Sequence, residues 1–204
     1  MSRDVYDKID FKNPEYTFIY QCAPVLAGLK ISNLLILNRL HLKKALELIR
    51  RFGLSAYMLY ATENKVSILV FNRKKTEEYT MKAENILFLR SCGYGEISVD
   101  TILKEIAVKY EGYMTQTSEF PDELGIMLGY PTEDVIGYIE NNGKDFLLNG
   151  YWKVYFNANE KEVLFKAFDE ATEKMIRSLI SENDIKPIVN MYNAGSQLHS
   201  EKTG

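Results

Sequence analysis

The chain has 204 residues, of which 46% are hydrophobic and 26% charged, with a formal net charge of −3. This length predicts one domain or two small lobes, and the composition excludes a disordered or a fibrous protein. The slightly negative charge gives no whole-chain attraction to nucleic acid, so we do not expect nucleic acid as a partner.

Cysteine and histidine are too few and too scattered for a structural metal site. The sequence has two of each, Cys22, Cys92, His41 and His199, and their spacing fits neither a zinc site nor an iron–sulfur cluster. The first residues lack the apolar core of a signal peptide, and no apolar run approaches the ~20 residues that cross a bilayer. We therefore expect a cytoplasmic protein that has no metal, does not enter a membrane, and carries two free thiols as packing residues.

Helical and strand patterns alternate in the first 80 residues. They predict a helix from Pro14, a strand at 33–37, a helix over 38–53, and a hairpin of strands at 55–61 and 66–71. Pro24 and Gly28 should break or kink the structure around them. Both hairpin strands are apolar on both faces, which predicts a sheet covered on both sides.

Helical patterns dominate the rest of the chain. We expect helices over 81–92 and from Ser98, two short helices starting at the Phe120-Pro121 and Tyr130-Pro131 pairs, a strand at 151–156, and a long helix over 157–181. The stretch 73–78 is charged and shows no apolar period. Asn157 and Glu160 have the spacing of a capping box at the start of the long helix.

These elements predict the α+β class. The expected fold is a small, mainly antiparallel sheet, built from the hairpin at about 55–71 and strands near 33–37 and 151–156, packed with about six to eight helices. We expect a single globular domain over 1–192, or two lobes divided into a mixed part, 1–80, and a mainly helical part, 81–192. The polar residues 193–204 predict a flexible tail.

Three blocks of sequence carry a family resemblance. They are CAPVLAGLK at 22–30, FPDELG at 120–125 running into LGYP at 128–131, and GYWKVY at 150–155. Together they resemble the bacterial family called domain of unknown function 3793, over about residues 15–180. The resemblance implies a whole-length cytosolic protein and supplies no activity, substrate or cofactor. The family pattern has a histidine where this chain has Asp122, so any role of that histidine would pass here to a carboxylate or be lost.

Four carboxylates lie near the two expected short helix starts: Asp122, Glu123, Glu133 and Asp134. They could bind a hard cation, or raise one another's pKa for acid/base chemistry. Alternatively, they only complement the helix dipoles. Adjacent helical residues diverge by about 100°, so Asp122 and Glu123 cannot form a catalytic pair by themselves.

Two glycines stand inside expected helices, where each costs about 1 kcal/mol relative to alanine. Gly125 and Gly137 therefore indicate close approach by a neighbouring helix or by a ligand.

On the expected strand at 151–156, side chains alternate between two faces. One face takes Trp152, Val154 and Phe156, and the other takes Tyr151, Lys153 and Tyr155. Two tyrosines beside a cation could stack on a planar anion. They could equally form the outer face of an amphipathic strand.

Positive charge is concentrated in one segment. Residues 30–75 carry ten basic side chains against Glu47 and Glu63. This segment could bind phosphate, nucleic acid or an acidic protein, or it could pair with acidic groups within the fold or in a dimer.

We interpret the chain as a non-catalytic or regulatory binding protein for a small anionic ligand or a protein partner. The candidate ligand-binding residues are Lys30, Asp122, Glu123, Tyr130, Tyr151, Lys153 and Tyr155. We expect the segments near 30, 125 and 153 to meet around one polar recess. Two alternatives remain: an enzyme using Glu123 and Asp122 as acid/base groups or cation ligands, and a binder of acidic partners or nucleic acid through residues 39–75. The sequence identifies no cofactor and leaves an oligomer open.

Overall fold

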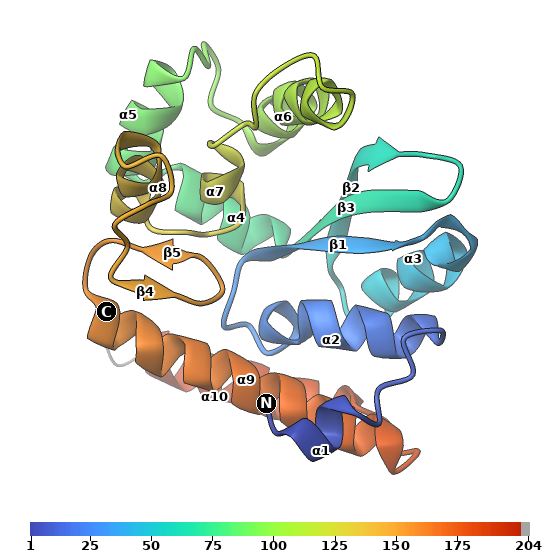
Figure 1. Ribbon diagram of the computed structural model, residues 1–204. Helices are drawn as coiled ribbons and strands as arrows, with labels where there is room; N and C mark the ends of the chain where they lie inside the picture. The colour runs from blue at the N-terminus through green and yellow to red at the C-terminus, as the bar shows by residue number, and fades with distance from the viewer. Residues whose placement is uncertain (201–204) are drawn as a thin grey trace.

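The computed structural model describes residues 1–200, with side chains to residue 194, and shows an α+β fold (Figure 1). That part of the chain contains ten α-helices, one 3-10 helix and two small antiparallel sheets. The helices are α1 (Arg3–Tyr6), α2 (Pro14–Leu26), α3 (Leu42–Arg51), α4 (Arg73–Thr80), α5 (Ala83–Ser91), α6 (Val99–Met114), α7 (Leu124–Met127), α8 (Thr132–Glu140), α9 (Ala158–Ile180) and α10 (Lys186–Ser200), with the 3-10 helix at Arg39–His41. The predicted class is confirmed.

The main sheet has three antiparallel strands, β1 (Ser32–Asn38), β2 (Ser55–Ala61) and β3 (Lys65–Phe71), in the order β1-β3-β2. The hairpin and the strand near 33–37 are therefore confirmed. Ile68 of β3 pairs with Leu35 on one side and with Met58 on the other. The exposed edge of β1 is closed by a side chain of α2, because the Gln21 amide exchanges two hydrogen bonds of 2.9 Å with the backbone of Ile36.

Both faces of this sheet are covered, as the apolar strands predict. Val66, Ile68 and Val70 point into a cluster with residues of α2, α3, α9 and α10. Leu69 and Phe71, the alternate residues of β3, point into a second cluster with residues of α5, α6 and α7. Figure 1 shows α2 and α9 below the sheet and α6 above it.

Polar caps explain where several helices begin. The side chains of Asn13, Asn72 and Ser98 accept hydrogen bonds from backbone N–H groups in the first turns of α2, α4 and α6. Helix α4 occupies the charged stretch that showed no apolar period, because its buried side chains are two threonines, Thr76 and Thr80. Three helices that the sequence did not predict, α1, α4 and α10, bring the number in the described residues above the expected six to eight.

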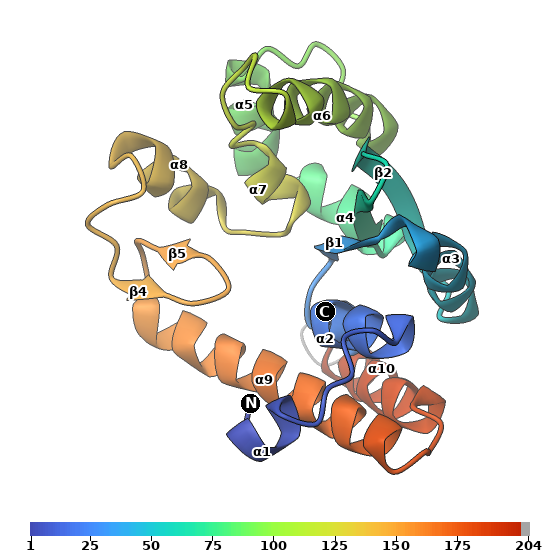
Figure 2. The same ribbon diagram turned by 45° about the vertical axis from the view of Figure 1, so that its right-hand side comes forward.

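The expected strand at 151–156 is wrong in extent and in place. Only β5 (Lys153–Val154) is a strand there, and it pairs with β4 (Leu148–Asn149) in a separate hairpin. This β4–β5 hairpin lies between α8 and α9 and does not join the main sheet (Figure 2). Trp152 and Val154 are buried as expected, but Phe156 is 51% exposed while Tyr155 is buried.

The predicted capping box at the start of α9 is also wrong. Asn157 has a φ of +53°, in the left-handed region, and its side chain makes no cap hydrogen bond to any residue that the structure describes. In the same way, α2 runs through Pro24 to Leu26, so the break comes at Gly28, with a φ of +69°.

The last described segment of the chain is helical. The predicted tail starts inside α10, which continues to Ser200, and residues 201–204 lie outside the described residues. Over the described helices, none combines the length and the apolar character that a membrane span requires. The single domain over 1–192 stays a prediction.

Candidate functional site

A cavity of about 360 Å³ lies where α7 and α8 meet the β4–β5 hairpin. We call it the site cavity. Its lining residues are Phe120, Asp122, Gly125, Leu128, Tyr130, Asp134, Val135, Tyr138, Asn149, Gly150, Tyr151, Trp152 and Lys153. The volume falls within the range of about 300–1,000 Å³ that is usual for small-molecule sites, and the lining is mostly apolar and aromatic with a few polar groups.

Four of the seven predicted site residues line this cavity: Asp122, Tyr130, Tyr151 and Lys153. They come from the loop before α7, the α7–α8 connection and the β4–β5 hairpin. Of the three segments expected to share one polar recess, those near 125 and 153 line the cavity and the one near 30 does not, and the lining is mostly apolar. Lys30, Glu123 and Tyr155 do not line it.

Lys153 supplies the cation of the cavity. Its ammonium donates a 2.5 Å hydrogen bond to the carbonyl oxygen of Gly143 and lies 5.1 Å from the ring centroid of Phe146. Within the described part of the chain, no carboxylate forms an ion pair with Lys153. Because an ammonium has three N–H donors, two remain for a ligand.

Asp122 supplies a carboxylate that is half-buried. Burial, reinforced by the charges of Glu123 and Glu119, raises the pKa of the Asp122 carboxyl. No hydrogen bond or ion pair reaches this carboxylate from any described residue. The lining thus carries two carboxylates, Asp122 and Asp134, and one ammonium, Lys153, and no ion pair joins any of the three to a described residue.

The aromatic wall of the cavity is fixed by ring contacts. Tyr130 stacks on Trp152 with ring centroids 4.8 Å apart, and Phe165 packs edge-on against Trp152 at 4.6 Å. The Tyr130 hydroxyl donates to the backbone oxygen of Tyr151 at 3.4 Å. The rings of Tyr130 and Trp152 are therefore occupied by one another, which makes them a rigid wall and not an open stacking platform.

Asp134 is a residue of the site whose role the sequence did not show. Its carboxylate, 1% exposed, accepts hydrogen bonds from the Trp152 indole at 2.8 Å and from the backbone N–H groups of Tyr155 and Phe156 at 2.8 and 3.1 Å. These bonds tie the β4–β5 hairpin to the first turn of α8. They also use two N–H groups that a longer strand would have donated to a neighbouring strand.

Glu123 points away from the cavity. Its side chain is buried, accepts a 3.0 Å hydrogen bond from the Tyr94 hydroxyl and forms an ion pair with the Lys109 ammonium of α6. Burial, followed by the charge of Glu123, raises the pKa of Tyr94. Asp122 and Glu123 therefore diverge, as helical spacing implies. In the region that the structure describes, no three His, Cys, Asp or Glu side chains gather into a metal-ligating group.

Lys30 lies behind the aromatic wall. Its side chain is 6% exposed and donates a 2.7 Å hydrogen bond to the Asn33 amide oxygen, and its ammonium lies 5.3 Å from the ring centroid of Tyr130. Burial lowers the pKa of Lys30 to about 8. The third segment of the expected recess thus contacts the cavity wall without entering the cavity.

The two helical glycines are explained by protein contacts. A Cβ on Gly125 would lie 2.8 Å from Cγ2 of Val135 in α8, and a Cβ on Gly137 would lie 2.6 Å from Cγ of Tyr155. Side chains of the fold, and not a ligand, occupy the space that a methyl group would need. This contact also explains why Tyr155 is buried against α8 and cannot share a face with Tyr151.

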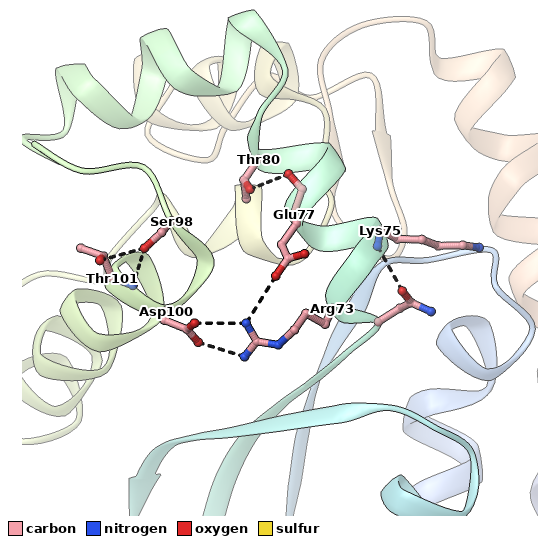
Figure 3. A network of polar contacts seen from close by, with 8 residues as sticks. Arg73, Lys75, Glu77, Thr80, Ser98, Asp100 and Thr101 are labelled. Carbon is pink, nitrogen blue, oxygen red and sulfur yellow. Dashed lines mark hydrogen bonds and ion pairs between the residues drawn. The ribbon is translucent and has the colours of Figure 1, made fainter.

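The basic segment is partly neutralised within the fold. Arg73 forms a two-pronged contact with Asp100 of α6, at 2.9 and 3.1 Å, and a further contact with Glu77 (Figure 3). Lys44 pairs with Glu15 at 2.6 Å and Arg51 with Asp184 at 2.7 Å. Asp100, Glu15 and Asp184 all lie outside residues 30–75, so part of the charge excess is balanced internally.

Comparison with known proteins agrees with the sequence blocks that surround the cavity. The model of the family described as protein of unknown function (DUF3793) matches residues 18–189. The chain belongs to this family. All three blocks of the resemblance, and the whole lining of the site cavity, lie inside the matched part of this DUF3793 member. No curated protein and no solved structure matches the chain.

Proposed function

We propose that the chain is a cytoplasmic, non-catalytic binding protein whose small anionic ligand occupies the site cavity. The observation that carries this proposal is the cavity itself, which Lys153 lines with no ion-pair partner among the described residues and whose other lining residues are mostly aromatic or apolar. A partly buried ammonium gains most from an anionic group that replaces its lost water. The two free cysteines fit a reducing compartment.

The competing functions draw on residues that have other contacts. The enzyme alternative depends on Glu123, whose carboxylate is occupied by Tyr94 and Lys109 outside the cavity. Binding of acidic partners or nucleic acid depends on the basic segment, in which Lys44, Arg51 and Arg73 have acidic partners. In the site cavity, by contrast, Lys153 has no acidic partner among the described residues.

The test is a thermal-shift screen of small anions, including nucleotides, sugar phosphates and carboxylates. A ligand present at 100 times its Kd stabilises by about 2.7 kcal/mol, which raises the Tm of a chain of this size by several degrees. We expect at least one anion to raise the Tm of the unmodified protein and not that of Lys153→Ala. Lys144→Ala, which removes an exposed lysine nearby, is the matched control and should keep the shift. If no anion raises the Tm, the proposal is wrong.

A further inference from the structure

Besides Asp134, whose carboxylate accepts three N–H hydrogen bonds, the site cavity is lined by two opposite charges that the fold leaves apart. Lys153 and Asp122 both line it, yet they do not pair with each other, and among the residues that the structure describes neither has another partner of opposite charge. Both side chains are half-buried, so each charge has lost part of its contact with water, which a ligand group of opposite charge would replace. Both charges would be compensated together by a ligand that carries the complementary pair.

We propose that the ligand of the site cavity is a zwitterion with a compact apolar body, the chemistry of a free α-amino acid. Its anionic group would contact the Lys153 ammonium and its ammonium group would contact the Asp122 carboxylate. This inference rests on the proposed function only in that the ligand presents an anionic group to Lys153, and it adds that the same ligand carries a positive charge. It adds a second recognition group, Asp122, that an anion alone would not use.

The rest of the lining fits the body of such a molecule. Leu128, Val135 and Tyr138 offer apolar surface to it. The volume of about 360 Å³ is near the lower end of small-molecule sites, which favours a compact ligand over a dinucleotide or a peptide.

The surroundings of Asp122 also favour a cation. Burial raises the pKa of its carboxyl, and the negative charges of Glu123 and Glu119 add to this effect. A purely anionic ligand would add a third negative charge beside this group. An ammonium group there would instead stabilise the ionised carboxylate.

The experiment uses three ligand series and isothermal titration calorimetry on the full chain. The zwitterions are L-phenylalanine, L-leucine and L-methionine. Each is compared with the acid that lacks its amino group and with the amine that lacks its carboxylate, so that the apolar body stays constant. We expect at least one zwitterion to bind, and removal of either charged group to weaken binding by about tenfold or more.

Two variants assign the charges to residues. In Asp122→Asn, the zwitterion and its des-amino acid should bind with similar affinity. In Lys153→Gln, the zwitterion and its amine should do so. Glu119→Gln and Lys144→Gln remove exposed charges nearby and should keep the full discrimination. Circular dichroism establishes that each variant is folded, and the ligand comparison on the unmodified protein needs no variant.

Two outcomes would overturn the inference in different ways. If the des-amino acids bind as tightly as the zwitterions, and only Lys153→Gln weakens binding, the zwitterion inference is wrong and the proposed anion site is supported. If none of the three zwitterions binds, the zwitterion inference is wrong, and the anion screen decides the proposed function separately.

Discussion

The carboxylate of Asp134 and the indole N–H of Trp152 are joined by a buried hydrogen bond of 2.8 Å. Through this bond, and through the backbone N–H groups of Tyr155 and Phe156, one side chain of α8 holds the hairpin that forms a wall of the site cavity. An asparagine at position 134 would place its amide NH2 group where one carboxylate oxygen now accepts, so either the Trp152 N–H or the two backbone N–H groups would face another donor. We expect Asp134→Asn to lower the free energy of unfolding by about 2–4 kcal/mol, measured by urea denaturation.

Glu133→Gln is the matched control for that change. Glu133 lies in the same first turn of α8 but is exposed, so it contributes only its interaction with the helix dipole, about 0.3–1 kcal/mol. Equal losses in the two variants would contradict a special role for Asp134.

Gly137 should respond to alanine in the opposite sense to an ordinary helical glycine. Alanine usually stabilises a helix by about 1 kcal/mol relative to glycine. Here the added methyl group would lie 2.6 and 2.7 Å from Cγ and Cβ of Tyr155, atoms that cannot move without the backbone. We expect Gly137→Ala to destabilise the protein by about 1–3 kcal/mol in chemical denaturation. Gly95→Ala, with no atom within 4 Å of its added Cβ, should cost nothing, and a stabilised Gly137→Ala would show that the hairpin yields easily.

Glu123→Gln separates a structural role from a catalytic one. The buried carboxylate accepts the Tyr94 hydroxyl and pairs with Lys109, so its neutralisation should cost about 1–3 kcal/mol of stability. An acid/base role without structural importance would leave the unfolding curve unchanged. If the guanidinium chloride concentration at the midpoint of unfolding does not change, the result would therefore favour the enzyme alternative.

Asp122 should make the protein less stable as the pH rises. Because the pKa of its carboxyl is raised above the ordinary 3.8, its protonated form is favoured by the folded state. The associated stability is present below pH 3.8 and is lost as the pH rises through the raised pKa. Asp122→Asn should therefore match the unmodified protein in Tm at low pH and exceed it at neutral pH. Identical Tm profiles from pH 3 to 8 would count against an unpaired carboxylate.

Lys30 should make stability increase with pH in an alkaline window. Burial lowers the pKa of its ammonium from 10.5 to about 8, so the unfolded chain binds more protons between these values. Stability then rises with pH over that range, by roughly 3 kcal/mol in all. We expect the difference in unfolding free energy between the unmodified protein and Lys30→Met to change by this amount from pH 8 to 10.5. Both proteins should carry Cys22→Ala, because the charges of Cys22 and Lys30 shift each other's pKa. A difference that stays constant with pH would then mean that the Lys30 ammonium is solvated in the folded protein.

The sequence predicted correctly those helices and strands that are stabilised by contacts between residues close together in the chain. The helix after Ser98 has its cap and an apolar face, and the hairpin of β2 and β3 has two apolar strands around a polar turn. Both are confirmed. Helix α4 escaped prediction because Thr76 and Thr80 form its buried face, and threonine gives no apolar period; the capping side chain of Asn72 was its one visible signal.

The candidate site was less predictable because its geometry depends on contacts between distant residues. The aromatic run after Gly150 has the composition of a strand, yet Asp134, about 20 residues earlier, takes the N–H groups of Tyr155 and Phe156. The direction of Glu123 depends on Tyr94 and Lys109, which no spacing rule connects to it. The sequence pointed to Asp122, Tyr130, Tyr151 and Lys153 as candidate site residues, and these four line the cavity. It did not predict that the Tyr130 ring would separate Lys30 from the cavity.

The apolar cluster below the main sheet is assembled from the two ends of the chain, since Phe18 and Ile19 of α2 pack with Met175 and Ile176 of α9. During synthesis, α2 leaves the ribosome more than a hundred residues before the helix that covers it. A nascent chain that has just completed the β4–β5 hairpin therefore still exposes this apolar surface to the solvent. Such a chain is a substrate for chaperones, and a product terminated there should be cleared by proteases instead of accumulating as a smaller folded protein.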